Sequence, residues 1–529
     1  MEHATFIPVN LAKKSLYWKY WIIFVAFGMG LACTRSGEAV DISSSLSIGT
    51  AQTSSTKPSL IMGTTGQPTP FLPDTKPTDI PTSMFSTPTM DPTRVSLLST
   101  TGPGSYVVQP GDTIGSIAAR FGVTPESIIQ LNQLSNPSAL EVGQVLMIPV
   151  PESEKPGPNF KIIPDSELVY GPAANGFDPA DFLKGKQGYL QNYREVVNNR
   201  ERTGPELILF TAEQYSVNPR ILMTVLEYAA GWISNSSPSV EKQTYPFLPI
   251  SGKENLYKQL AWAADQLNYG YYHWKTGGTD YWTLSDQSIV RVGSGINAGT
   301  AGVQYLMAQI YGREDWLAAV SESGVYATYA SMFGYPFLWS IDPVVPPDLV
   351  QPTLTLPFEE GVHWYFTGGP HGGWASGSAW AAIDFAPTGI ALGCVPSDDW
   401  VVASAPGLVV HSDEGAVVED LDSDGNEHSG WTILYMHIET RNRVPLGTHL
   451  KLADRIGHPS CEGGFANGTH THLARRFNGE WIAADGPIPF VLSGWVASGT
   501  GTEYDGYLTQ GDQTIEACDC GAPANEIWR

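Results

Sequence analysis

The residues from Asp41 to Gly104 constrain the fold most, because a segment of this composition cannot contribute to a packed core. Ser, Thr, Pro and Gly dominate it, as in TKPSLIMGTTGQPTPFLPDTKPTDI. Such residues bury too little apolar surface to order the chain, and the prolines keep the backbone extended. We therefore predict a disordered tether over residues 34–104. The whole chain has 529 residues, which is too many for a single hydrophobic core. We therefore expect the remaining residues to form several domains.

The first 33 residues have the pattern of an export signal. Lys13, Lys14 and Lys19 precede the apolar run YWIIFVAFGMGLA, which is short for a membrane-spanning helix. Cys33 follows at once, and GLAC resembles a bacterial lipobox, in which the cysteine is lipidated. The resemblance implies a lipid anchor at Cys33 and an extracytoplasmic location in the cell envelope. Plain secretion and an uncleaved anchor are the alternatives.

Charge and cysteine content narrow the possible partners. A net charge of -24 argues against nucleic acid, whose phosphates attract Lys and Arg. In an exported protein, Cys394 and Cys461 could form a disulfide. A bond between Cys518 and Cys520 would be strained, so we do not expect it.

A small module follows the tether at residues 105–150. The pattern predicts a strand at 106–108, a helix at 113–121, a second helix capped by Thr124 with Pro125 in its first turn, and a strand at 145–148. The motifs YVVQPGDT, FGVT, LNQL and GQVLMIP resemble the LysM family. That resemblance implies a βααβ fold and binding of N-acetylglucosamine-containing glycans such as peptidoglycan.

Residues 159–350 have a helical pattern, from which we predict an all-α domain. In NPRILMTVLEYAAGW, Asn218 is a helix cap and Pro219 occupies the first turn. This segment resembles the first active-site helix of lysozyme-like lytic transglycosylases, and the resemblance places the family's catalytic Glu at Ala229. Glu227 cannot replace it simply, because two residues turn a helix by about 200°. We therefore expect no glycan cleavage here; a helical spacer unrelated to lysozyme is the alternative.

Residues 354–495 change to short strands and glycine-rich turns, which predicts a mainly antiparallel β domain, followed by a C-terminal extension at 496–529. Most of the histidines lie in this region. In GTHTHLARRF, His470 and His472 stand two residues apart and should project to the same side of a strand. Such a pair can serve one metal or one substrate, although a polar strand face would look the same.

Four motifs in this domain occur together: GGPHGGW, AAIDFAP, TILYMHI and GTHTHLARRF. They resemble the lysostaphin/LytM-type zinc metallopeptidases of the bacterial cell wall. The resemblance implies that His371, Asp384 and His472 bind Zn²⁺, and that His470 and His437 are catalytic. The spacing between His371 and Asp384 is longer than the family's usual one, so His363 is an alternative first ligand.

Together these features predict an exported peptidoglycan endopeptidase that uses Zn²⁺ to hydrolyse a peptide bond in the wall. Its expected partners are peptidoglycan and, through a lipid anchor, the membrane. A protein that binds the wall without catalysis and recruits other hydrolases is the alternative.

Overall fold

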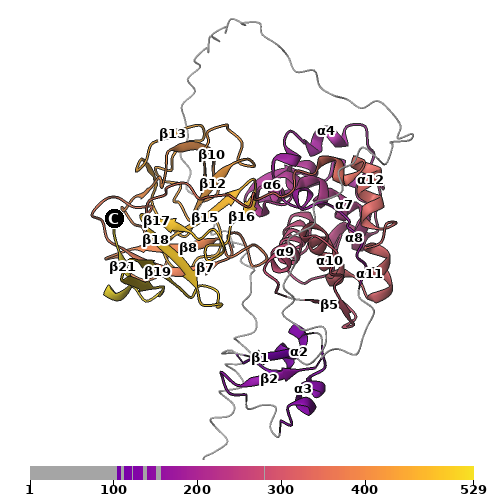
Figure 1. The fold of residues 1–529 in the computed structure, drawn as a ribbon. Helices are drawn as coiled ribbons and strands as arrows, with labels where there is room; N and C mark the ends of the chain where they lie inside the picture. The colour runs from indigo at the N-terminus through magenta and orange to yellow at the C-terminus, as the bar shows by residue number, and fades with distance from the viewer. Residues whose placement is uncertain (1–103, 109–111, 122, 135–139, 150–156, 279) are drawn as a thin grey trace, which may run out of the picture. The chain divides into compact units, whose positions relative to one another are not determined.

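The computed structural model describes residues 104–108, 112–121, 123–134, 140–149, 157–278 and 280–529 (Figure 1). The predicted export signal, Cys33 and the tether up to residue 103 lie outside the described residues. Within the described ranges, no helix has both the length and the apolar character needed to cross a membrane.

The first module has the predicted βααβ order. It consists of β1 (Gly104–Val107), α2 (Ile114–Phe121), α3 (Pro125–Leu131) and β2 (Val145–Ile148), and β1 pairs with β2 antiparallel. Thr124 caps α3 by accepting a hydrogen bond from the Ser127 backbone N–H. The module has a core of its own, in which Ile117, Ile128 and Leu146 are fully buried.

The middle domain is mostly helical. Its helices are α4 (Pro179–Leu183), α5 (Tyr189–Asn192), α6 (Gly204–Tyr215), α7 (Pro219–Ala230), α8 (Val240–Thr244), α9 (Leu256–Lys275), α10 (Ala298–Ile310), α11 (Arg313–Ala319) and α12 (Val325–Phe333), with 3₁₀ turns η1 (Asp165–Glu167), η2 (Pro172–Ala174) and η3 (Pro336–Trp339). It also contains two hairpins, β3 (Arg194–Val197) with β4 (Arg200–Thr203) and β5 (Tyr281–Thr283) with β6 (Ile289–Arg291). The all-α prediction is therefore wrong in this respect, because these short amphipathic segments pair locally.

Helix α7 begins as predicted, with the Asn218 side chain accepting a hydrogen bond from the Arg220 backbone N–H. Arg220 also forms a buried ion pair with Glu167, with Nη2 and Oε1 2.6 Å apart. Asn218 and the Tyr329 hydroxyl donate to the same carboxylate, so its oxygens are satisfied. Glu227 accepts hydrogen bonds from the Ile233 and Ser234 backbone, which gives it a structural role at the end of α7.

The C-terminal domain is built on a nine-stranded antiparallel sheet. Its strands are β13 (His449–Leu450), β10 (Gly407–Asp413), β11 (Ala416–Asp420), β12 (Trp431–Met436), β15 (Thr471–Phe477), β8 (Ala382–Pro387), β7 (Trp364–His371) and β21 (Glu526–Ile527) in spatial order, and β16 (Glu480–Trp481) pairs with β15. Smaller sheets are formed by β9 (Val401–Val402) with β14 (Arg455–Gly457), and by β17 (Val491–Leu492), β18 (Trp495–Gly499), β19 (Gly506–Gln510) and β20 (Gln513–Glu516). The predicted antiparallel β character is confirmed.

Residues 496–529 are part of this domain, so the predicted extension is wrong. Strand β21 extends the main sheet by pairing with β7. Leu508, Ile515 and Ile527 are buried in the same core as Trp364. Cys394 and Cys461 form the disulfide considered above, and Cys518 is also bonded to Cys520, contrary to our expectation.

The helical domain covers one face of the main sheet. Residues directly opposite one another in a sheet share a face, and Met436 lies opposite both Ala416 and His472. Side chains of this face share a core with the helical domain: Ala416, Val418, Leu434, Met436, Ala474 and Trp481. Across the contact, Glu480 accepts hydrogen bonds from Tyr271 at 2.9 Å and Lys275 at 2.6 Å.

Candidate metal centre

Three predicted ligands converge on the sheet face that the helical domain covers. His371 ends β7, Asp384 lies in β8, and His472 lies opposite Asp384 in β15. His371 Nε2 is 2.9 Å from His472 Nδ1, and Asp384 Oδ1 is 3.3 Å and 3.4 Å from these two nitrogens. All three residues are buried, with exposed fractions of 7% or less. Three potential ligand atoms therefore surround one point.

The long spacing between the first two ligands is accommodated by a hairpin. His371 pairs with Ala382 in the antiparallel register of β7 and β8, and Gly368 pairs with Asp384. The intervening loop is held by the helical domain, because Asp265 in α9 accepts hydrogen bonds from the Gly377 backbone and the Ser376 hydroxyl. This role of Asp265 was not predicted, since nothing in the helical sequence pattern connects it with a loop more than 100 residues away.

The rings of His371 and His472 are each oriented by a hydrogen bond from the nitrogen that points away from the cluster. His371 Nδ1 donates to the Gly369 carbonyl at 2.8 Å, and His472 Nε2 donates to the Gly373 carbonyl at 3.1 Å. A carbonyl oxygen can only accept, so in neutral rings the facing nitrogens carry lone pairs. Asp384 Oδ1 has no hydrogen-bond partner among the described residues. Three acceptors at this distance repel one another unless a cation lies between them.

The pKa values of the three groups reflect this crowding. Burial alone would lower the pKa of His371, but the Asp384 carboxylate, the Gly369 carbonyl and the charge of Glu503 together outweigh it, so the net shift is upward. Burial lowers the pKa of His472. The pKa of Asp384 stays well below its usual range because the neighbouring imidazoles outweigh the effect of burial. One positive charge therefore belongs in the cluster, and a metal ion can supply it in place of a proton.

Two more imidazoles stand beside the cluster, with ring centroids 4.4 Å apart: His437, just after β12, and His470, just before β15. His437 Nδ1 donates to the Glu462 carbonyl, and His470 Nδ1 donates to the Gly468 carbonyl, both at 2.8 Å. In their neutral forms, both rings therefore keep a lone pair on Nε2. Burial and the nearby imidazoles lower the pKa of His437 to about 3.

His437 has φ +64°, a left-handed conformation that is uncommon for a residue with a side chain. Its carbonyl accepts hydrogen bonds from the backbone and the hydroxyl of Ser460, at 2.7 Å and 3.0 Å. Strain of this kind persists only where surrounding contacts determine it, and it is common at functional sites. The loop around Ser460 thus sets the direction of the His437 ring.

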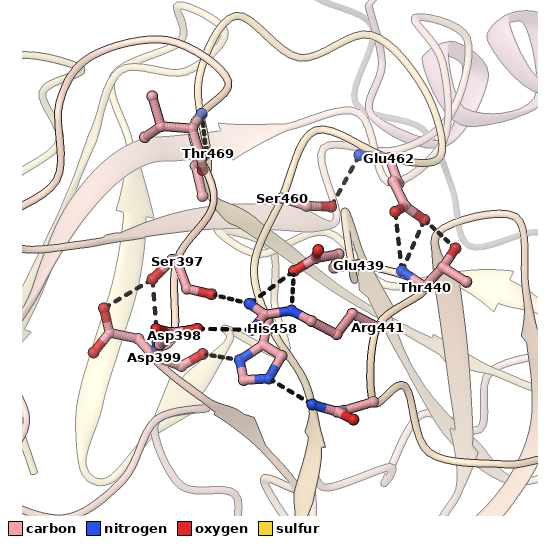
Figure 2. A network of polar contacts seen from close by, with 12 residues as sticks. Ser397, Asp398, Asp399, Glu439, Thr440, Arg441, His458, Ser460, Glu462 and Thr469 are labelled. Carbon is pink, nitrogen blue, oxygen red and sulfur yellow. Dashed lines mark hydrogen bonds and ion pairs between the residues drawn. The ribbon is translucent and has the colours of Figure 1, made fainter.

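A polar network holds this loop in place (Figure 2). Glu462 accepts hydrogen bonds from the backbone and hydroxyl of Thr440, and Arg441 donates to Asp398 and Glu439. The Cys394–Cys461 disulfide lies one residue from Glu462. The sequence did not predict this network, because charged residues in turns look like ordinary solvated surface.

His363 does not reach the cluster. Its ring is stacked on Trp528 with centroids 4.7 Å apart, and its Nδ1 lies 2.7 Å from Glu526 Oε1. The structure therefore favours His371 over His363 as the first ligand. His470 and His472 do project to the same side, because both approach the Asp384 carboxylate, at 3.9 Å and 3.4 Å. The arrangement can hold one divalent cation and offers two further imidazoles for proton transfer.

Comparison with known families assigns two segments of the chain. Residues 106–149 match the family model of the LysM domain, and residues 161–345 match that of the LasA N-terminal domain. These two segments are therefore similar to a LysM domain and to a LasA N-terminal domain, in that order along the chain.

Curated relatives match over short stretches. A secreted LysM effector of Passalora fulva is 45% identical over 49 residues, or 9% of this chain and 22% of the relative. An N-acetylmuramoyl-L-alanine amidase of Bacillus subtilis is 45% identical over 56 residues, or 10% of this chain and 19% of the relative. The chain thus spans about a fifth of the length of these relatives.

The solved structures that the chain matches include M23 metallopeptidases. The M23 metalloprotease pseudoalterin is 21% identical, with 34% of this chain and all of that chain covered and a TM-score of 0.28. The catalytic domain of lysostaphin from Staphylococcus simulans is 19% identical, with 24% of this chain and 89% of that chain covered and a TM-score of 0.17.

Proposed function

We propose that the chain is an exported peptidoglycan endopeptidase in which His371, Asp384 and His472 hold Zn²⁺. The observation that carries this proposal is the convergence of three acceptor atoms whose imidazoles are oriented by hydrogen bonds to backbone carbonyls. Two imidazoles and one carboxylate are a common ligand set for catalytic zinc, and such carbonyl contacts usually orient metal-bound histidines.

A zinc ion bound by these residues supplies Lewis-acid chemistry, which acidifies water and polarises the carbonyl of the scissile bond. His470 and His437 are placed to handle the protons. Each presents a lone pair on Nε2 in the neutral form, so it can accept a proton from the attacking water. Once protonated, the same nitrogen can donate to the developing oxyanion or to the leaving amine.

The LysM domain supports a substrate in the cell wall. LysM domains bind glycans that contain N-acetylglucosamine, so residues 105–150 would hold the enzyme on peptidoglycan while the C-terminal domain cleaves peptides. The basic and apolar residues before Cys33 support export, and the GLAC sequence supports a lipid anchor in the cell envelope.

The second candidate function is binding of the wall without catalysis, as a recruiter of other hydrolases. It is less well supported, because the three proposed ligands converge and the two further histidines stand beside them. Glycan cleavage by the helical domain is also less well supported, because Ala229 cannot donate a proton and Glu227 is bonded to backbone N–H groups.

The decisive experiment combines elemental analysis of the purified chain with cleavage of purified muropeptides. We expect about one zinc per chain and new amino termini that map to peptide bonds. Binding of walls without zinc and without released peptides would favour the non-catalytic function.

A further inference from the structure

The side chain of Glu462 is bonded to Thr440, three residues after His437 in the chain. Both carboxylate oxygens accept the Thr440 backbone N–H, at 3.0 Å and 2.9 Å, and Oε2 also accepts the Thr440 hydroxyl at 2.6 Å (Figure 2). Hydrogen bonds to an ionised acceptor are stronger than those between neutral groups. The carboxylate of Glu462 therefore ties its own loop to the segment that follows β12.

The backbone of Glu462 is connected to His437 in two ways. The Glu462 carbonyl accepts a hydrogen bond from His437 Nδ1 at 2.8 Å. The Glu462 N–H donates to the Ser460 hydroxyl at 3.0 Å, and this hydroxyl donates to the His437 carbonyl, also at 3.0 Å. Both the ring and the backbone of His437 are therefore held by groups whose positions depend on Glu462.

The loop that carries these groups has few restraints in its own backbone. Gly463 follows Glu462 and has φ +81°, and glycine restricts the backbone less than any other residue. The loop also packs closely on the turn between β10 and β11, because a Cβ atom added to Gly415 would lie 2.5 Å from the Glu462 carbonyl carbon. The Cys461 disulfide holds the loop just before Glu462. On the other side of that disulfide, the Glu462 carboxylate is the side-chain group that fixes the loop to Thr440.

The proposed reaction needs His437 in one tautomer and one orientation. While Nδ1 donates to the Glu462 carbonyl, the neutral ring keeps its lone pair on Nε2, the nitrogen proposed to accept a proton. The ring of His470 lies beside it, with the two centroids 4.4 Å apart. A shift of the Glu462 carbonyl would let the His437 ring turn and would misplace Nε2.

We propose that Glu462 is a positioning residue for peptide hydrolysis and that it acts through His437. Its carboxylate holds the loop on Thr440, and the loop holds the carbonyl that accepts from His437 Nδ1. The inference rests on the proposed function, since His437 moves a proton only if the chain cleaves peptides. Because the carboxylate is bonded to Thr440 and not to the three proposed ligands, its removal should leave zinc bound.

The first test measures kcat, KM and zinc content of the full chain on purified muropeptides. Glu462→Ala removes the contacts with Thr440, so we expect kcat to fall roughly 10- to 100-fold, the range for losing a group that orients an active-site side chain. KM and zinc content should stay near those of the wild type, because His437 acts in the chemical step. Unchanged kcat in Glu462→Ala would overturn the proposal.

Two further variants serve as a graded substitution and a matched control. Glu462→Gln keeps an amide oxygen that can accept the Thr440 N–H, so kcat should fall less than in Glu462→Ala. Glu516→Gln changes an exposed carboxylate of β20 in the same domain and should behave as the wild type. Thermal unfolding verifies that each variant is folded.

A double-variant cycle separates positioning of His437 from general damage to the fold. If Glu462 acts through His437, then Glu462→Ala should cause no further loss of kcat in a chain that already carries His437→Ala. A full additional loss in the double variant would show that Glu462 acts by another route, and the proposal would be wrong.

Failure of this inference and failure of the proposed function give different results. If the wild type cleaves no peptide, the proposed function is wrong, and NMR of the chain with isotope-labelled histidine decides the positioning role separately. The His437 Nδ1–H signal is identified by its absence from His437→Ala. It should exchange slowly with water in the wild type and rapidly in Glu462→Ala, and equal exchange in both proteins overturns the inference.

Discussion

His371 Nε2 and His472 Nδ1 lie 2.9 Å apart, although 101 residues separate them in the chain. The outer nitrogen of each ring donates to a backbone carbonyl, so neutral rings would place two lone pairs face to face. Folding brings these groups together through the β7–β8 hairpin and the pairing of β8 with β15. The fold therefore brings together lone pairs that repel one another, and a cation bound between them would remove this repulsion.

The two histidines of GTHTHLARRF should respond differently to substitution. His472→Ala removes a proposed ligand, so we expect loss of both zinc and peptide cleavage. His470→Ala leaves the three proposed ligands intact, so zinc should remain near stoichiometric while the rate falls on the order of 10² to 10⁴, the usual effect of losing a general base or an oxyanion donor. His437→Ala should resemble His470→Ala.

Elemental analysis and turnover on muropeptides measure these two effects separately, with circular dichroism to verify folding. Equal zinc content in the His470 and His472 variants would remove His472 from the ligand set. Full activity in both variants would show that His470 and His472 are only polar residues on a strand face.

Removal of the metal should destabilise the C-terminal domain. A ligand that binds only the folded state adds stability, and without it the acceptors of His371, Asp384 and His472 repel one another. We expect a chelator to lower the melting temperature of the wild type and zinc to restore it. His472→Ala should melt at the same temperature with and without the chelator. If the chelator leaves the melting temperature of the wild type unchanged, no bound metal ion stabilises the domain.

The sequence predicted the elements of the LysM domain and the antiparallel character of the last domain, because strand alternation and helix caps are local. The resemblance of four short motifs also pointed to His371, Asp384 and His472, which the fold brings together. The sequence could not place Asp265 or Glu480, because their roles depend on contacts between domains. The pairing of β21 with β7 was missed for the same reason: it joins the end of the chain to a strand about 160 residues earlier.

The buried carboxyl group of Glu419 should make stability fall as pH rises. Glu419 is fully buried, and burial raises its pKa to about 8, although the Tyr435 hydroxyl donates to it. The folded state therefore keeps a proton that the unfolded chain releases above pH 4.5, so the stability is lost between about pH 4.5 and 8. Glu419→Gln cannot ionise and should be spared this loss.

The measurement is the free energy of unfolding of both proteins at pH 5 and pH 8.5. Relative to the wild type, Glu419→Gln should gain about 1.4 kcal/mol for each unit by which the pKa of Glu419 is raised. Glu241→Gln is the control for an exposed carboxylate. Parallel pH dependence in all three proteins would show that Glu419 ionises normally.

Deletion of residues 105–150 should separate wall binding from catalysis. The LysM domain has its own core, so its removal leaves the buried residues of the other domains covered. We expect the shortened chain to sediment poorly with insoluble peptidoglycan and to digest whole walls slowly, while its kcat on soluble muropeptides stays within about twofold. Undiminished binding to walls would show that another part of the chain targets the protein to peptidoglycan.

The buried pair of Glu167 and Arg220 should show strong energetic coupling. Both charged groups are buried, and the guanidinium of Arg220 makes two contacts with the carboxylate, at 2.6 Å and 3.0 Å. Glu167→Gln leaves the cation without its partner, so we expect a loss of about 3–5 kcal/mol, as for other broken buried pairs. Arg220→Met should cost less, because the remaining carboxyl group can take up a proton and keep its contacts with Asn218 and Tyr329.

The double variant should lose less than the sum of the two single losses, since neither charge is left behind. Calorimetric unfolding of the four proteins measures the coupling, and additive losses would show that the pair contributes no specific stabilisation.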